Sequence, residues 1–122
     1  MMLPRIANQR AIIDRRAVAD AVATTFAEQG EKSRQTVVEI LRAALESGRA
    51  EIARRLIAKP SAGTECAQAQ AFLVDQLVRV IYDHVVARVY RASNRSMGER
   101  IAVIAVGGYG RGEMAPHSDV DI

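Results

Sequence analysis

The 122-residue sequence has one cysteine, no tryptophan, two lysines and no long apolar run. The single Cys66 excludes an internal disulfide and any metal site built from several cysteines, which fits a reducing, cytoplasmic location. The longest apolar run, Ile101–Val106, is far too short to span a bilayer, and no apolar signal segment precedes Asp14. We therefore expect a cytoplasmic protein without a membrane partner.

Aromatic residues make up only 4% of the chain, so its core must be built from alanine and aliphatic side chains. Such a composition favours helices. Residues 1–13 show no clear periodicity, and we expect a loose arm there. Asp14 is a good N-cap and Gly30 a good C-terminal stop, so the intervening residues are expected to form the first helix.

Three further helices are expected before residue 98. Ser33 can cap the second, and Gly48 is expected to end it. The apolar spacing predicts a third helix over residues 49–59. The longest helix is expected to begin at Thr64 and to fray within 92–97, where serine, asparagine and glycine accumulate.

The composition changes after this point. Residues 101–106 form a continuous, partly β-branched run that is typical of a strand buried on both faces. A glycine turn follows at 107–112, and 119–122 alternate like a second strand. We therefore expect an α+β chain, with an N-terminal helical region at 1–97 and an incomplete second domain at 98–122. Because a domain rarely ends within such a strand, we expect the chain to be a fragment of a longer protein.

Two short patterns in the last 25 residues suggest chemistry. Gly107 and Gly108 would let the backbone approach a ligand closely, and free N–H groups of a following turn bind anions such as triphosphate oxygens. Asp119 and Asp121 would project from the same face of a strand, where two carboxylates can share Mg²⁺, the usual cation beside phosphates. Each pattern is weak alone, and together they predict a metal-dependent nucleotide site. A Rossmann fingerprint is excluded by Glu113, and a P-loop by the lack of a nearby lysine.

The segment Ala105–Ile122, with the sequence AVGGYGRGEMAPHSDVDI, resembles the nucleotidyltransferase signature of the bifunctional uridylyltransferase/uridylyl-removing enzymes. These enzymes modify the PII signalling protein. The preceding helical stretch, including Gly48–Ile52, is similar to that family's N-terminal region, though less specifically. The resemblance implies that residues 98–122 begin a nucleotidyltransferase palm of the polymerase-beta-like kind.

The resemblance also implies roles for individual residues. Asp119 and Asp121 would be catalytic carboxylates that hold Mg²⁺. The implied contacts to the nucleotide come from a second set of residues: Gly107, Gly108, Arg111 and Ser118. The reaction implied is transfer of UMP from UTP to a tyrosine hydroxyl of PII. In that family a separate HD domain removes the UMP and ACT domains sense glutamine; neither these nor the third carboxylate are found in this chain, which we therefore expect to be inactive alone.

Two other functions remain open at this point. The same signature suits another nucleotidyltransferase, such as a protein adenylyltransferase, because the residues do not specify the base. The chain could alternatively be a non-enzymatic helical interaction module in which the glycine turn is only structural. No nucleic-acid partner is expected, since no aromatic stacking platform accompanies the arginines at 54, 55, 88, 91 and 95. We expect His84 to be an ordinary helix-face residue and His117 to be a solvated turn residue.

Overall fold

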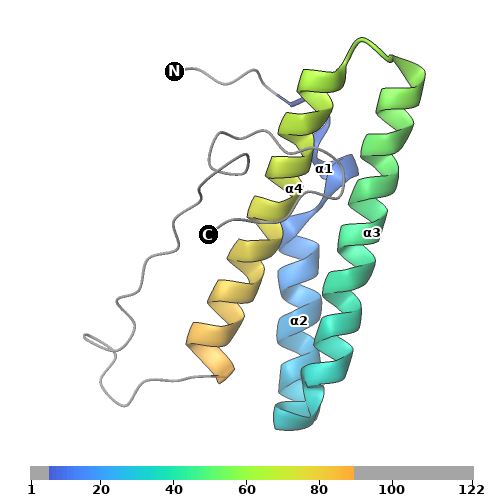
Figure 1. Ribbon diagram of the computed structural model, residues 1–122. Helices are drawn as coiled ribbons and strands as arrows, with labels where there is room; N and C mark the ends of the chain where they lie inside the picture. The colour runs from blue at the N-terminus through green and yellow to red at the C-terminus, as the bar shows by residue number, and fades with distance from the viewer. Residues whose placement is uncertain (1–5, 90–122) are drawn as a thin grey trace.

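The computed structural model describes residues 6–89, and over this range the chain is a bundle of helices (Figure 1). The elements follow in the order α1 (Gln9–Ile12), α2 (Arg15–Gln29), the 3₁₀ turn η1 (Gly30–Ser33), α3 (Arg34–Ala58), α4 (Gly63–His84) and the π-helical turn η2 (Val85–Val89). The three long helices lie side by side and successive ones run in opposite directions. The short α1 packs against α3 near the end of the bundle where α3 leads into α4.

The expected α+β class is wrong for the part of the chain that the structure describes. Residues 6–89 are almost entirely helical and contain no strand. The physical reason is that aliphatic, alanine-rich patterns of helical period fill this whole range, with only short turns between them. The segments expected to be strands, 101–106 and 119–122, and the expected domain boundary after residue 97 lie outside the described residues.

Helix α2 begins and ends where its local sequence predicts. The Asp14 carboxylate accepts a hydrogen bond of 3.2 Å from the Ala17 N–H, which satisfies one of the free donors at the helix start. At the other end Gly30 has a φ of +59°, a left-handed conformation that favours glycine, and its N–H donates to the Phe26 carbonyl. Both predicted boundaries of this helix are confirmed.

The predicted start of α3 after Ser33 is confirmed, but the side-chain cap expected there is absent, and the predicted start of α4 is wrong. Ser33 does not cap α3 with its side chain; it is buried in η1, which joins α2 to α3 without an extended residue between them. Helix α4 begins at Gly63 rather than after a Thr64 cap, and its N-cap position is Ala62, which has no side-chain acceptor. In both places the tight connection between helices fixes the start, so a side-chain cap is not required.

The expected loose arm at 1–13 is corrected by α1. Ile12 is only 2% exposed and belongs to the main core cluster, together with Ile52 of α3 and Leu73 of α4. A four-residue helix has little stability of its own, because helix nucleation is unfavourable. Burial of Ile12 between α3 and α4 therefore holds α1 in place.

Gly48 was expected to end a helix, and this prediction is wrong. Helix α3 continues through it as one helix of 25 residues. A methyl group added at Gly48 would lie 2.5 and 2.7 Å from the Leu73 methyl groups and 2.9 Å from the Ile12 carbonyl oxygen. Glycine is needed here because α1 and α4 approach α3 so closely, not because the helix stops.

A second core cluster joins the three long helices further along the bundle. Val22 of α2, Val37 of α3 and Val80 of α4 are all buried and pack together. In the sequence each of these valines recurs at helical spacing with other apolar residues of its helix, as expected for a core-facing side. The helical packing of the described residues therefore follows the sequence pattern, apart from α1 and the continuity of α3. None of the described helices combines the length and apolar character needed to cross a bilayer.

Candidate functional site

All the site residues predicted from the sequence lie outside the described residues. They are the glycines Gly107 and Gly108, the polar residues Arg111 and Ser118, and the carboxylates Asp119 and Asp121. Their mutual geometry therefore stays a prediction. What the structure does describe is the helical bundle that precedes them, and two polar clusters within it.

The first polar cluster attaches the segment before α1 to the C-terminal half of α3. Arg55 donates from Nη1 to the Ala7 carbonyl at 2.7 Å and from Nη2 to the Asn8 carbonyl at 3.0 Å. Its Nε donates to Glu51 Oε1 at 3.0 Å. Asn8 has a φ of +48°, in the left-handed region that asparagine tolerates better than most residues. We call this group of contacts the Arg55 clamp.

Glu51 is held from two directions. Arg54 donates from Nη2 to Oε1 at 2.6 Å and from Nε to Oε2 at 3.0 Å, a fork that matches the carboxylate. Hydrogen bonds from Arg54 and then from Arg55 lower the pKa of Glu51 from 4.5 to about 2. The same hydrogen bond from Arg54 raises the pKa of that guanidinium. Both arginines are thus engaged with Glu51, and the cluster acts as a structural tie between segments.

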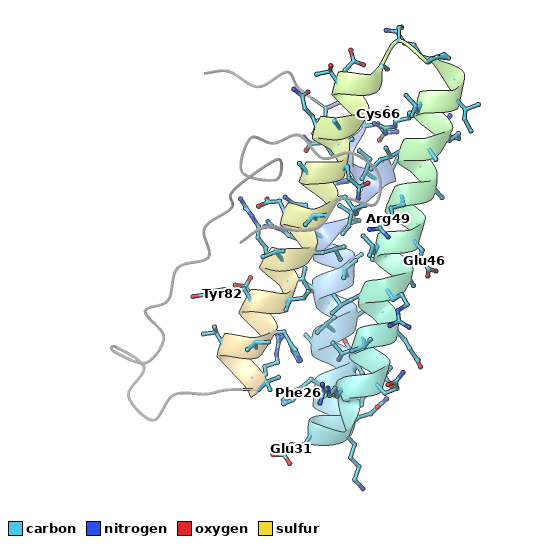
Figure 2. The ribbon with its side chains drawn as sticks, in the orientation of Figure 1. Phe26, Glu31, Glu46, Arg49, Cys66 and Tyr82 are labelled. Carbon is cyan, nitrogen blue, oxygen red and sulfur yellow. The ribbon has the colours of Figure 1, made fainter. Side chains whose placement is uncertain are left out.

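A cavity of about 540 Å³ lies beside the Arg55 clamp, between the end of α3 and the start of α4. Cys66 lines it from α4 and is buried; its thiol lies 3.9 Å from the Ile52 carbonyl oxygen, a weak hydrogen bond. Figure 2 shows Cys66 at this end of the bundle, on the side of α4 that faces α3. Within residues 6–89 no three His, Cys, Asp or Glu side chains gather where they could hold a metal ion. Among the described residues, the cavity wall therefore presents hydrogen-bonding groups and charged side chains, but no cluster of metal ligands.

The second polar cluster surrounds His84 at the opposite end of α4. His84 is a helix-face residue of α4, as expected, and the face is the buried one: its side chain meets the Phe26 ring edge-to-face, with ring centroids 5.5 Å apart. Arg88 Nη1 lies 3.4 Å from His84 Nδ1. Burial, and secondarily the charge of Arg88, lowers the pKa of His84 below its ordinary value of 6.5. This favours the neutral ring as part of the core.

The arginines that might have formed one basic patch are separated within the described structure. Arg54 and Arg55 lie near the C-terminal end of α3, whereas Arg88 lies beyond the C-terminal end of α4, at the other end of the bundle (Figure 1). The Arg55 clamp is not apparent from the sequence. Its Glu51 partner could have been found from the four-residue spacing, but the carbonyls of residues 7 and 8 could not.

Comparison with known proteins shows that the similarity extends over nearly the whole chain, helices included. The chain is 82% identical over 121 residues to a protein of Novosphingobium aromaticivorans and 59% identical over 119 residues to one of Erythrobacter litoralis, covering 99% and 98% of this chain. A protein of Rhodospirillum rubrum is 42% identical over 125 residues, which cover all of this chain. All three carry the same name. The chain matches a fragment of the bifunctional uridylyltransferase/uridylyl-removing enzyme. This confirms the resemblance predicted from residues 105–122.

The chain spans 13% of the length of each of these three relatives. The alignments run through the helices as well as through the glycine and aspartate patterns. The similarity to the uridylyltransferase/uridylyl-removing enzymes therefore includes the helical bundle at residues 6–89. No family model matches the chain, and no solved structure matches it.

Proposed function

We propose that this chain is part of a uridylyltransferase that transfers UMP from UTP to a tyrosine hydroxyl of the PII signalling protein, under control by glutamine. The observation that carries the proposal is the 82% identity over 99% of the chain to a bifunctional uridylyltransferase/uridylyl-removing enzyme. The glycine and aspartate patterns support it independently, because they would supply the two functions that such a transfer requires: a phosphate-binding turn and a carboxylate pair.

In this proposal the chain's own residues hold the nucleotide. Backbone N–H groups after Gly107 and Gly108 bind phosphate oxygens, and Arg111 adds a positive charge beside them, while Ser118 fixes the turn before the carboxylates. Asp119 and Asp121 are the residues that would hold Mg²⁺, since two hard carboxylate ligands suit this cation. When bound, Mg²⁺ supplies neutralisation of the charge that collects on the triphosphate oxygens.

The second activity in the relatives' name, uridylyl removal, is proposed to use residues that this chain does not contain. The chain spans only 13% of those enzymes, and its candidate residues all suit the transfer reaction. We accordingly expect the 122-residue chain alone to transfer no UMP. Measurable turnover by the isolated chain, with purified PII and labelled UTP, would contradict that expectation.

Labelled nucleotides test the function in the full-length enzyme that contains this segment. We expect the label of UTP, and not that of ATP, to reach PII. Labelling by ATP alone would instead favour a protein adenylyltransferase, and labelling by neither would favour a non-enzymatic helical module.

Conservative substitutions test the residues. Asp119→Asn and Asp121→Asn should each lower the rate of transfer by about 100-fold or more, because losing a metal ligand removes several kcal/mol of charge stabilisation. Asp20→Asn is the matched control, since Asp20 is an exposed residue of α2, and its rate should equal that of the parent enzyme. If either variant, Asp119→Asn or Asp121→Asn, transferred UMP at the rate of the parent enzyme, the proposed site would be rejected.

A further inference from the structure

Residues 6–12, which include α1, are attached to α3 and α4 at few points. Within the described residues, every hydrogen bond that joins this segment to the two helices comes from Arg55, which donates to the Ala7 and Asn8 carbonyls. The one buried side chain of the segment is that of Ile12, which packs in the main core cluster. The attachment therefore depends mainly on Arg55 and Ile12.

The same segment forms one wall of a poorly filled space. The cavity of about 540 Å³ has residues 6–8 on one side, and the end of α3 and the start of α4 on the others. Side chains that face a space of this size lack part of the close contact that stabilises a packed core. The three long helices, by contrast, pack directly on one another through Val22, Val37 and Val80. We therefore expect residues 6–12 to be held less firmly than the rest of the bundle.

The connection from this segment to α2 can act as a hinge. Ile13 and Asp14 are both extended, with φ, ψ of −158°, 133° and −97°, 92°, and they separate α1 from α2. The Asp14 carboxylate accepts from the Ala17 N–H, so the first turn of α2 keeps its cap when the residues before Asp14 move. Rotation at these element-terminal residues can displace the segment without unwinding α2.

We propose that residues 6–12 form a latch, which swings away from α3 and α4 about Ile13 and Asp14 while the three long helices stay packed. In the closed state the latch covers one side of the cavity. In the open state the cavity is exposed to solvent, together with the thiol of Cys66, which lines it. The latch thus controls access to the cavity. The proposal does not depend on the reaction that the enzyme catalyses.

The backbone of Asn8 sets the balance between the closed and the open latch. Its φ of +48° lies in the left-handed region, which glycine and asparagine adopt at lower cost than alanine. The Asn8 side chain is exposed and makes no capping hydrogen bond to α1, so a substitution there acts mainly through the backbone. Asn8→Ala should therefore favour the open latch, whereas Asn8→Gly should not.

Thiol labelling of the full-length enzyme that contains this segment tests the proposal. The enzyme also carries Val22→Cys as an internal reference, because Val22 belongs to the cluster that joins the three long helices. Labelling by N-ethylmaleimide is measured at positions 66 and 22 by mass spectrometry, and each rate is divided by the rate at the same position in the unfolded chain. We expect Cys66 to react at least about tenfold faster than position 22, since its exposure requires only local opening.

Two substitutions separate opening of the latch from unfolding of the bundle. Arg55→Met should raise the labelling rate of Cys66 about tenfold or more, because it removes both hydrogen bonds to the latch. Val37→Ala leaves a cavity beside position 22, so it should raise the rate at position 22 about tenfold or more. It should leave the rate at Cys66 within about twofold, because Val37 stays packed when the latch opens.

A matched pair at Asn8 and a control at Arg54 complete the experiment. Asn8→Ala should raise the labelling rate of Cys66 about threefold or more, because alanine disfavours the left-handed φ that the closed latch requires. Asn8→Gly should change it by less than about twofold. Arg54→Met should also change it by less than about twofold, since the hydrogen bonds of Arg54 within the described residues go to Glu51 and not to the latch.

Three results would overturn the proposal. Equal protection at Cys66 and at position 22 would mean that the cavity opens only when the bundle unfolds. The same conclusion would follow if Val37→Ala raised the rate at Cys66 as much as the rate at position 22. A Cys66 rate that neither Arg55→Met nor Asn8→Ala increases would show that residues 6–12 do not control access to the cavity.

Discussion

Replacing Gly48 by alanine should destabilise the bundle, although alanine is the better helix former. In an exposed helix interior the change would stabilise by about 1 kcal/mol. Here the new methyl group would lie 2.9 Å from the Ile12 carbonyl oxygen, which is main chain, and closer still to both Leu73 methyl groups. Overpacking of this kind costs about 1–3 kcal/mol, and two of the three contacts fall on a side chain that is fully buried and has little room to move. We expect a net loss of about 1–2 kcal/mol in the free energy of unfolding.

Urea denaturation followed by far-UV circular dichroism measures this loss, and thermal melting should show a fall in Tm of roughly 5–15 °C for a domain of this size. Gly63→Ala is the matched control, because nothing lies within 4 Å of a methyl group added at Gly63 at the start of α4. That variant should be neutral or more stable. If Gly48→Ala were as stable as the parent protein, the close approach of the three helices at this residue would be refuted.

A double-mutant cycle identifies the neighbour responsible. Leu73→Ala alone should cost about 2–5 kcal/mol, because it leaves a cavity in the core. The double variant Gly48→Ala/Leu73→Ala should lose about 1 kcal/mol less free energy of unfolding than the sum of the two single losses, since the new methyl group then occupies part of that cavity. Additive losses would show that the main-chain oxygen of Ile12, rather than Leu73, limits the space.

Other predictions concern the two polar clusters. Arg55→Met should lower the free energy of unfolding by about 1–3 kcal/mol, through loss of the hydrogen bonds to two main-chain carbonyls, and should speed hydrogen exchange in α1. Arg54→Met is the control, because Arg54 is exposed and its hydrogen bonds within the described residues go to Glu51; equal losses in both would argue against the clamp. For His84, the pKa is lowered in the folded protein, so the unfolded chain binds protons more readily and stability should fall as the pH drops below about 6.5. The slope should be at most about 1.4 kcal/mol per pH unit. His84→Gln should remove this slope in urea titrations between about pH 7.5 and 5.5, while His117 remains in both proteins; an unchanged slope would refute the assignment.

Local signals in the sequence predict α2 because every residue that sets its ends is within one turn of it. Asp14 is followed three residues later by the N–H that it caps, and Gly30 adopts a backbone conformation that other residues rarely do. No distant partner is needed, so the sequence alone suffices. The apolar faces follow in the same way from helical spacing.

Gly48 and Arg55 show why other features could not be predicted. A glycine within a helical pattern can end the helix or admit a neighbour, and only the positions of Ile12 and Leu73 decide between the two. Arg55 meets the Ala7 and Asn8 carbonyls across more than forty residues of sequence, a separation at which spacing carries no information. For the candidate site, short sequence patterns are enough to identify the residues. Its geometry, however, depends on contacts between distant segments, which these patterns do not specify.

The position of Ile12 also constrains the order in which the bundle assembles. Its site exists only after α3 and α4 have crossed at Gly48, whereas the long helices are consecutive in sequence and can pair through short connections. We therefore expect attachment of α1 to be a late event, after the rate-limiting barrier to folding. On that expectation, weakening the attachment should leave the refolding rate almost unchanged and accelerate unfolding instead, so that α1 would govern how long the native bundle lasts rather than how fast it forms.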